Sequence, residues 1–167
     1  MQQTYNMNTV LSHLPDHSRV WIYTSSRAFT PVEEEEISQL GKSFVSNWKA
    51  HGSALEADCI VMYNHFVIIA ADEQVAGVSG CGIDSSVRFV QELEKKYQVT
   101  LLDKLNIAYK NESMEVVVEP MFDFQGKMDQ GAVHAETIVF NNLVENMGEL
   151  RKQWEVPLKD SWHKQLL

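Results

Sequence analysis

The run Phe-Val-Ile-Ile-Ala-Ala at residues 66–71 is the stretch that most constrains the fold of this chain. Its apolar side chains occupy both alternating sets of strand positions, so the run predicts a strand in the centre of a sheet. Residues 58–63 predict a second strand, and only Asn64 and His65 separate the two. Asparagine is a favoured first residue of a tight hairpin turn, so these two strands are expected to pair antiparallel.

Helix signals lie on both sides of this hairpin. Thr30, Pro31 and Glu33 form a capping box with proline at the first helical position, which predicts a helix that starts at residue 31. After the hairpin, apolar residues recur on one helical face over residues 83–97, which predicts a second helix. The other expected strands lie at residues 19–24, 105–109, 115–118 and 136–140, and a third helix is expected after residues 141–142.

The order of the first six elements is strand, helix, strand, strand, helix, strand. This order predicts a ferredoxin-like βαββαβ core, an α+β fold in which one mainly antiparallel sheet carries its helices on one face. A C-terminal strand and helix would extend this core. The strand at 19–24 is apolar or aromatic on both faces and is also expected to be central. No linker, repeat or low-complexity tract interrupts the chain, so residues 1–167 are expected to form a single domain.

Charge and cysteine content bear on the classes of function. The chain has 23 acidic residues against 14 basic ones, a net charge of -9. An acidic surface repels phosphate backbones, so nucleic acid is not an expected partner. The N-terminus has no signal-peptide pattern and the apolar runs are too short to cross a bilayer, so the protein is predicted to be cytoplasmic and without a membrane partner. Cys59 and Cys81 are then expected to be reduced thiols.

The stretch from residue 78 to residue 86 is the main candidate site, because a buried strand leads into it and an amphipathic helix leads out of it. Free backbone amides at a helix start bind anions, and glycine lets a ligand approach the backbone closely. The stretch therefore predicts a site for a small anionic ligand. Its candidate binding residues are Gly80, Gly82, Asp84, Ser85 and Ser86, with Arg88 one turn into the helix and Arg27 after the first strand as sources of positive charge.

A cysteine-dependent hydrolase or transferase is the alternative function. Cys81 lies at the predicted helix start, where a thiol has a lowered pKa and is more nucleophilic. Catalysis also requires a base. His65 lies at the far end of the strand, about 20 Å away at ~3.3 Å per residue, so His134 or His163 is the better candidate. A buried, inert Cys81 would instead favour a non-catalytic interaction module that forms a homodimer.

Other motifs lack the residues that their chemistry requires. A P-loop needs a glycine five positions before Gly41-Lys42-Ser43, and that position is Glu36. His134-Ala135-Glu136 matches the first half of the zinc deaminase signature, but both cysteines lie upstream of it rather than in a downstream P-C-x-x-C. Neither a metal site nor a cofactor is predicted.

Several segments together resemble a known family. They are residues 19–23, 63–66, 79–89, 140–144, 154–157 and 161–163. Along most of its length the chain resembles a family of small uncharacterised proteins from Bacteroidetes-type bacteria, whose members often carry the label "ABC transporter ATPase". The resemblance implies a bacterial protein but no activity or functional residues. The missing P-loop glycine argues against the ATPase label for this chain.

Overall fold

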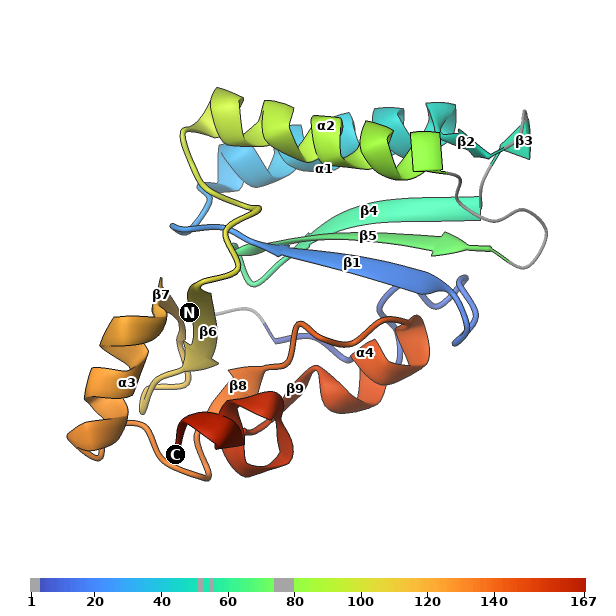
Figure 1. Ribbon diagram of the computed structural model, residues 1–167. Coiled ribbons are helices and arrows are strands. Elements are labelled where there is room, and N and C mark those ends of the chain that lie inside the picture. Colours follow the sequence, from blue (N-terminus) through green and yellow to red (C-terminus); the bar gives the residue numbers. More distant parts are fainter. Residues whose placement is uncertain (1–3, 51–52, 55, 74–79) are drawn as a thin grey trace.

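The computed structural model describes residues 4–50, 53–54, 56–73 and 80–167 (Figure 1). The helix signals correspond to α1 (Pro31–Asn47) and α2 (Gly80–Tyr97), and two further helices follow, α3 (Met121–Asp129) and α4 (Met147–Gln153). The strands and short 3-10 helices are β1 (Arg19–Thr24), β2 (Lys49–Ala50), β3 (Ser53–Ala54), β4 (Glu56–Met62), β5 (Phe66–Asp72), β6 (Asn106–Lys110), β7 (Val116–Pro120), β8 (Ile138–Phe140), β9 (Glu155–Pro157), η1 (Leu158–Asp160) and η2 (Trp162–Leu166).

Two antiparallel sheets form the centre of the molecule. The first has the strand order β1-β5-β4 and the second has the order β7-β6-β8-β9. The predicted hairpin is confirmed, since β4 pairs with β5 from Glu56↔Asp72 to Met62↔Phe66. Its turn includes one residue more than expected, because Tyr63 and Asn64 both have positive φ, at 52° and 57°.

The sheets and helices stack in layers, as Figure 1 shows. Helices α1 and α2 cover one face of the first sheet, and the second sheet with α4 covers the other face. The outer face of the second sheet packs against α3 and the C-terminal 3-10 helices. Strand β5 is central, as predicted, and its first six residues are fully buried because both of its faces are covered.

The α+β class is confirmed, but the ferredoxin-like arrangement with helices on one face of a single sheet is wrong. In that arrangement β6 would lie next to β1, whereas β6 pairs with β7 and β8 in the second sheet. Strand β1 lies at an edge of its sheet rather than at the centre. The reason lies in β5, whose second apolar face would be exposed if all strands joined one sheet covered on one side.

The C-terminal segment also differs from the sequence prediction. Helix α4 begins after Asn146, whose side chain accepts a hydrogen bond from the Glu149 amide at 2.9 Å, rather than after residues 141–142. Residues 155–157 follow this helix and form the edge strand β9 beside β8. The N-terminus of α1 is as predicted, with the Thr30 side chain and Glu33 completing the capping box.

Gly41 lies where α1 crosses β4, so its function is to permit close packing rather than to bind phosphate. A Cβ atom at this position would lie 2.6 Å from Cys59 Sγ and 2.8 Å from Cys59 Cβ. Such distances are far below van der Waals contact, so the helix and the strand can approach this closely only because residue 41 has no side chain.

We therefore expect Gly41→Ala to lower the free energy of unfolding by about 1–3 kcal/mol through overpacking. Gly126→Ala is the matched control, because a Cβ atom in α3 at Gly126 meets nothing within 4 Å. That control should raise the free energy of unfolding by about 0.5–1 kcal/mol, the usual gain of alanine over glycine in a helix. Urea denaturation of both variants measures the two changes, and equal effects would contradict the packing argument.

Candidate functional site

A groove of about 780 Å³ lies between α1 and α2, and three aromatic side chains are among its lining residues. Phe44 and Phe89 stack almost parallel, with ring centroids 4.7 Å apart and an interplanar angle of 6°. Trp48 lies against Phe44 at a centroid distance of 5.2 Å. The remaining lining residues are Leu40, Ser43 and Asn47 of α1 and Gly82, Ser85, Arg88, Glu92, Leu93 and Lys96 of α2.

Three of the predicted binding residues line this groove. Gly82, Ser85 and Arg88 follow one another at intervals of three residues, which places them on one face of α2. Trp48 at the end of α1 donates from Nε1 to the Gly82 carbonyl oxygen at 2.9 Å, so the first turn of α2 is tied to α1. Arg88 donates from Nη2 to Ser85 Oγ at 3.4 Å, which holds the guanidinium beside the groove.

The charges along the groove alternate on successive turns of α2. Arg88, Glu92 and Lys96 all line it at i, i+4 spacing and are exposed. Within the described residues neither Arg88 nor Lys96 forms an ion pair. The groove therefore offers two cations that the described part of the protein does not neutralise by direct contact.

Other members of the predicted site point elsewhere or cannot be placed. Ser86 is 1% exposed and donates from Oγ to the Ile83 carbonyl oxygen at 2.7 Å, so it does not face a ligand. Asp84 is exposed but does not line the groove. Gly80 and Cys81 are the first residues of α2, but their surroundings, including those of the Cys81 thiol, lie outside the described residues, as do residues 78–79.

His134, the candidate base for Cys81, does not lie near the start of α2. It lies in the loop between α3 and β8, beyond the second sheet, where Val133 joins the outermost core cluster. Helix α2 covers the opposite side of the molecule, beyond the first sheet (Figure 1). His134 Nδ1 instead accepts a hydrogen bond from the Glu136 amide at 3.2 Å. His134 would approach the end of β5 only if β8 were its neighbour, but β8 pairs with β6.

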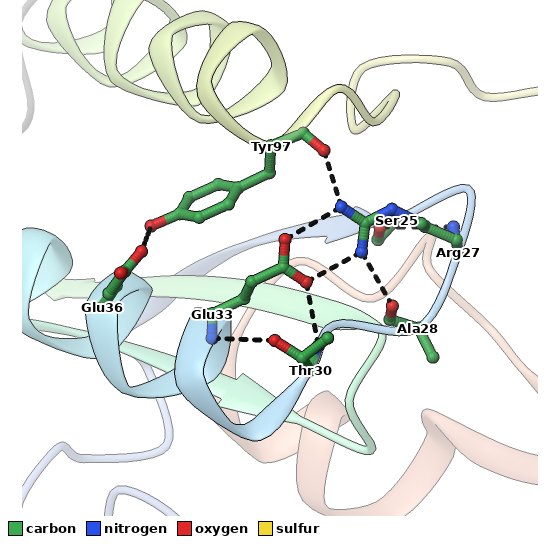
Figure 2. Close-up of polar contacts among 7 residues, drawn as sticks. All are labelled: Ser25, Arg27, Ala28, Thr30, Glu33, Glu36 and Tyr97. Carbon is green, nitrogen blue, oxygen red and sulfur yellow. Dashed lines mark hydrogen bonds and ion pairs between the residues drawn. The ribbon is translucent and has the colours of Figure 1, made fainter.

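Arg27 also lies away from the predicted anion site. Strands β1 and β5 are antiparallel, so the end of β1, which Arg27 follows, lies beside the start of β5 and not beside the end of β5 that leads toward α2. Figure 2 shows the result: Arg27 donates to both carboxylate oxygens of Glu33, at 2.8 and 2.9 Å, and to the carbonyl oxygen of Tyr97 at 2.7 Å. Tyr97 is the last residue of α2, so Arg27 connects the start of α1 to the C-terminal end of α2.

The same contacts change the acidity of Glu33. Hydrogen bonds from the Arg27 guanidinium and from the Thr30 backbone amide lower the pKa of Glu33 from 4.5 to about 2. A carboxyl group whose pKa falls on folding stabilises the protein while it is ionised, and this contribution disappears as pH falls through the lowered value.

Glu33→Gln keeps the capping hydrogen bond to Thr30 but removes the ionic part of the contact with Arg27. At neutral pH this variant should be about 1 kcal/mol less stable than the wild type. The difference should shrink as pH falls from 4.5 to about 2. Urea denaturation across this range measures it, with Glu35→Gln on the exposed side of the same helix as the control. A difference that persists undiminished at the acid end would contradict the ionic role of Glu33.

Cys59 is buried beneath α1 and is only 1% exposed. Burial, with a smaller contribution from Asp58, raises the pKa of its thiol to about 12. Thiolate is the reactive form, so Cys59 is chemically inert in the folded protein.

In a Cys81→Ser protein we expect iodoacetamide to modify Cys59 only as fast as the protein unfolds, because both burial and the raised pKa suppress the thiolate. Mass spectrometry with and without urea measures the rate. The Cys59→Ser protein then reports on Cys81 alone. Rapid native labelling of Cys59 would contradict its buried position.

The sequence analysis named none of Phe44, Trp48, Phe89 and Lys96 as a site residue. All four line the groove, Phe44 and Trp48 on α1 and Phe89 and Lys96 on α2. The signal was present in α2, since Arg88, Glu92 and Lys96 continue the face of Gly82 and Ser85 at helical spacing. Which face of α1 meets them could not be read from that spacing.

No family model, curated protein or solved structure matches the chain. The resemblance to the Bacteroidetes-type family therefore stays a prediction. The described residues include no group of three or more His, Cys, Asp or Glu side chains that could hold a metal ion. No helix among those residues combines the length and the apolar character that a membrane span requires.

Proposed function

We propose that this protein binds a small molecule that carries a flat apolar body and one anionic group in the groove between α1 and α2. The observation that supports this proposal best is that Gly82, Ser85 and Arg88 line the same groove as the stacked rings of Phe44 and Phe89. The anionic group would lie at the Arg88 end and the apolar body against the rings.

The apolar wall favours an aromatic or similarly flat ligand. Offset stacking and edge contacts between rings contribute about 0.5–1.5 kcal/mol beyond the burial of apolar area. Phe44 is partly exposed, and Phe89 and Trp48 hold it from two sides. A ring laid into the groove would therefore meet a surface that is already ordered, which reduces the entropy cost of binding.

The charges favour an anionic group over a neutral or cationic one. Arg88 presents a planar guanidinium that can donate two hydrogen bonds to a carboxylate, a sulfonate or a phosphate. Ser85 Oγ holds this guanidinium at 3.4 Å. Glu92 lies one turn further along and would repel an anion placed there, so the anionic group belongs at the Ser85 end of the groove.

Naphthoate and naphthol form a matched pair of probes, because they share the flat ring system and differ in the anionic group. We expect naphthoate to bind more tightly than naphthol, and Arg88→Gln to weaken naphthoate binding about tenfold, the effect of a lost charged hydrogen bond. Binding of naphthol should not change in that variant. Dissociation constants from NMR titration of the groove amides provide the test.

Lys152→Gln is the matched control, because it removes one exposed positive charge on α4, outside the groove. Its naphthoate affinity should equal that of the wild type. Equal binding of the two probes to the wild type, or an Arg88→Gln protein that binds naphthoate unchanged, would contradict an anion site at Arg88.

A further inference from the structure

The outer edge of β1 leaves main-chain groups without partners in a buried part of the molecule. In an antiparallel pair, alternate residues direct their N–H and C=O groups toward the partner strand and away from it. The Ser25 amide donates to the His65 carbonyl oxygen at 2.7 Å, on the β5 side. The odd-numbered residues of β1 therefore face β5, and the even-numbered residues face outward.

Both ends of the outward edge are closed by hydrogen bonds within the chain. The Val20 amide donates to the Glu145 carbonyl oxygen at 3.0 Å, and the Ser26 amide donates to the Thr100 carbonyl oxygen at 3.1 Å. These two contacts confirm the outward direction of the even-numbered residues. They also bound an open stretch of edge that contains Ile22 and Thr24.

Ile22 and Thr24 direct one N–H and one C=O group each to this open stretch. Within the described part of the chain, none of these four groups forms a hydrogen bond. The two residues are half-buried and buried respectively. Buried main-chain groups in folded proteins are almost always paired, so this stretch calls for a partner that supplies matching donors and acceptors.

A second cavity, of about 400 Å³, lies along this edge. Residues 20–24 of β1 line it on one side. The connection between α2 and β6, with Leu101 and Leu102, borders it, and so do the second sheet and the C-terminal residues Trp162 and His163. The edge of β1 therefore lines a cleft rather than a flat surface.

The polar groups in the cleft are fixed and carry almost no net charge. Asn142 donates from Nδ2 to Thr24 Oγ1 at 2.9 Å and accepts from Trp154 Nε1 at 2.8 Å, which locks its amide across the gap between the sheets. Burial lowers the pKa of His163 to about 4, so its ring is neutral at physiological pH. Asp103 and Lys104 are the charged lining residues among those described, and their charges cancel.

We infer that this cleft binds a short extended peptide segment of another protein, which adds as a strand to the open edge of β1 at Ile22 and Thr24. The alternating donors and acceptors, about 6.7 Å apart along the strand, match a peptide main chain and do not match an ion. Because this edge lines a cleft bordered by other elements, a single extended chain is the expected occupant rather than the sheet edge of a second copy of this protein. This inference is independent of the groove between α1 and α2.

Capped Val-Thr-Val-Thr is a suitable probe, because its main chain is extended and its side chains alternate in polarity. NMR titration at millimolar peptide should shift the amide signals of Ile22 and Thr24. The amides of Trp21 and Tyr23 should shift less, because they already bond to β5. Absence of a shift at Ile22 and Thr24 would overturn the inference.

N-methylation of alternate residues tests the main-chain contacts directly. One peptide is methylated at its first and third residues, and the other at its second and fourth. Only one of these two sets of amides can face β1, so one peptide should lose binding and the other should keep it. If both methylated peptides bind as well as the parent, the cleft does not recognise the main chain and the inference is wrong.

Ile22→Pro removes the outward amide at an edge position that tolerates proline. This variant should lose peptide binding while naphthoate binding in the other groove is retained. If the variant does not fold, the methylated peptides still decide the question in the wild type. A peptide-free dimer in which the Ile22 and Thr24 amides are protected from exchange would also overturn the inference, in favour of a second copy.

Discussion

The burial of both faces of β5 is the constraint on which the other layers depend. Its first six residues are completely buried, so the strand requires cover above and below. Helices α1 and α2 supply one cover through Ile37, Val90 and Leu93, and the second sheet with α4 supplies the other. Neither cover could be removed without exposing apolar area worth about 25 cal/mol per Å². The two proposed binding regions both follow from this arrangement, because the groove lies in the helical cover and the cleft lies at the seam between the two sheets.

Contacts between the two helices keep the helical cover in one register. Arg27 joins the start of α1 to the end of α2, and the Trp48 indole joins the end of α1 to the start of α2. The helices are therefore held at both ends by hydrogen bonds and between them by the stack of Phe44 on Phe89. A surface held in this way is ordered before a ligand arrives, which distinguishes it from an apolar patch that must rearrange to bind.

Local signals could be read from the sequence, and non-local ones could not. The Thr30 capping box, the hairpin at residues 63–65 and the central position of β5 all depend on residues close in the chain. The sheet that β6 joins does not depend on nearby residues. The apolar pattern of β6 fits either sheet, and the need to cover the second face of β5 determines which one it joins. The same distinction separates the site residues. Gly82, Ser85 and Arg88 share a face by helical spacing alone, whereas the positions of Arg27 and His134 depended on strand direction and strand order.

The pairing of β1 with β5 has a consequence for the order in which the chain folds. Strand β5 meets β4 through a turn of three residues, but it meets β1 only after the whole of α1 and β4 has been placed, with Arg19 opposite Ala71. Contacts between residues distant in the chain form late, because the closure of a long loop costs entropy before any contact repays it. Until β1 arrives, the most apolar strand of the protein has a free edge. The slow step of folding is therefore also the step at which the nascent chain is most exposed to aggregation through β5.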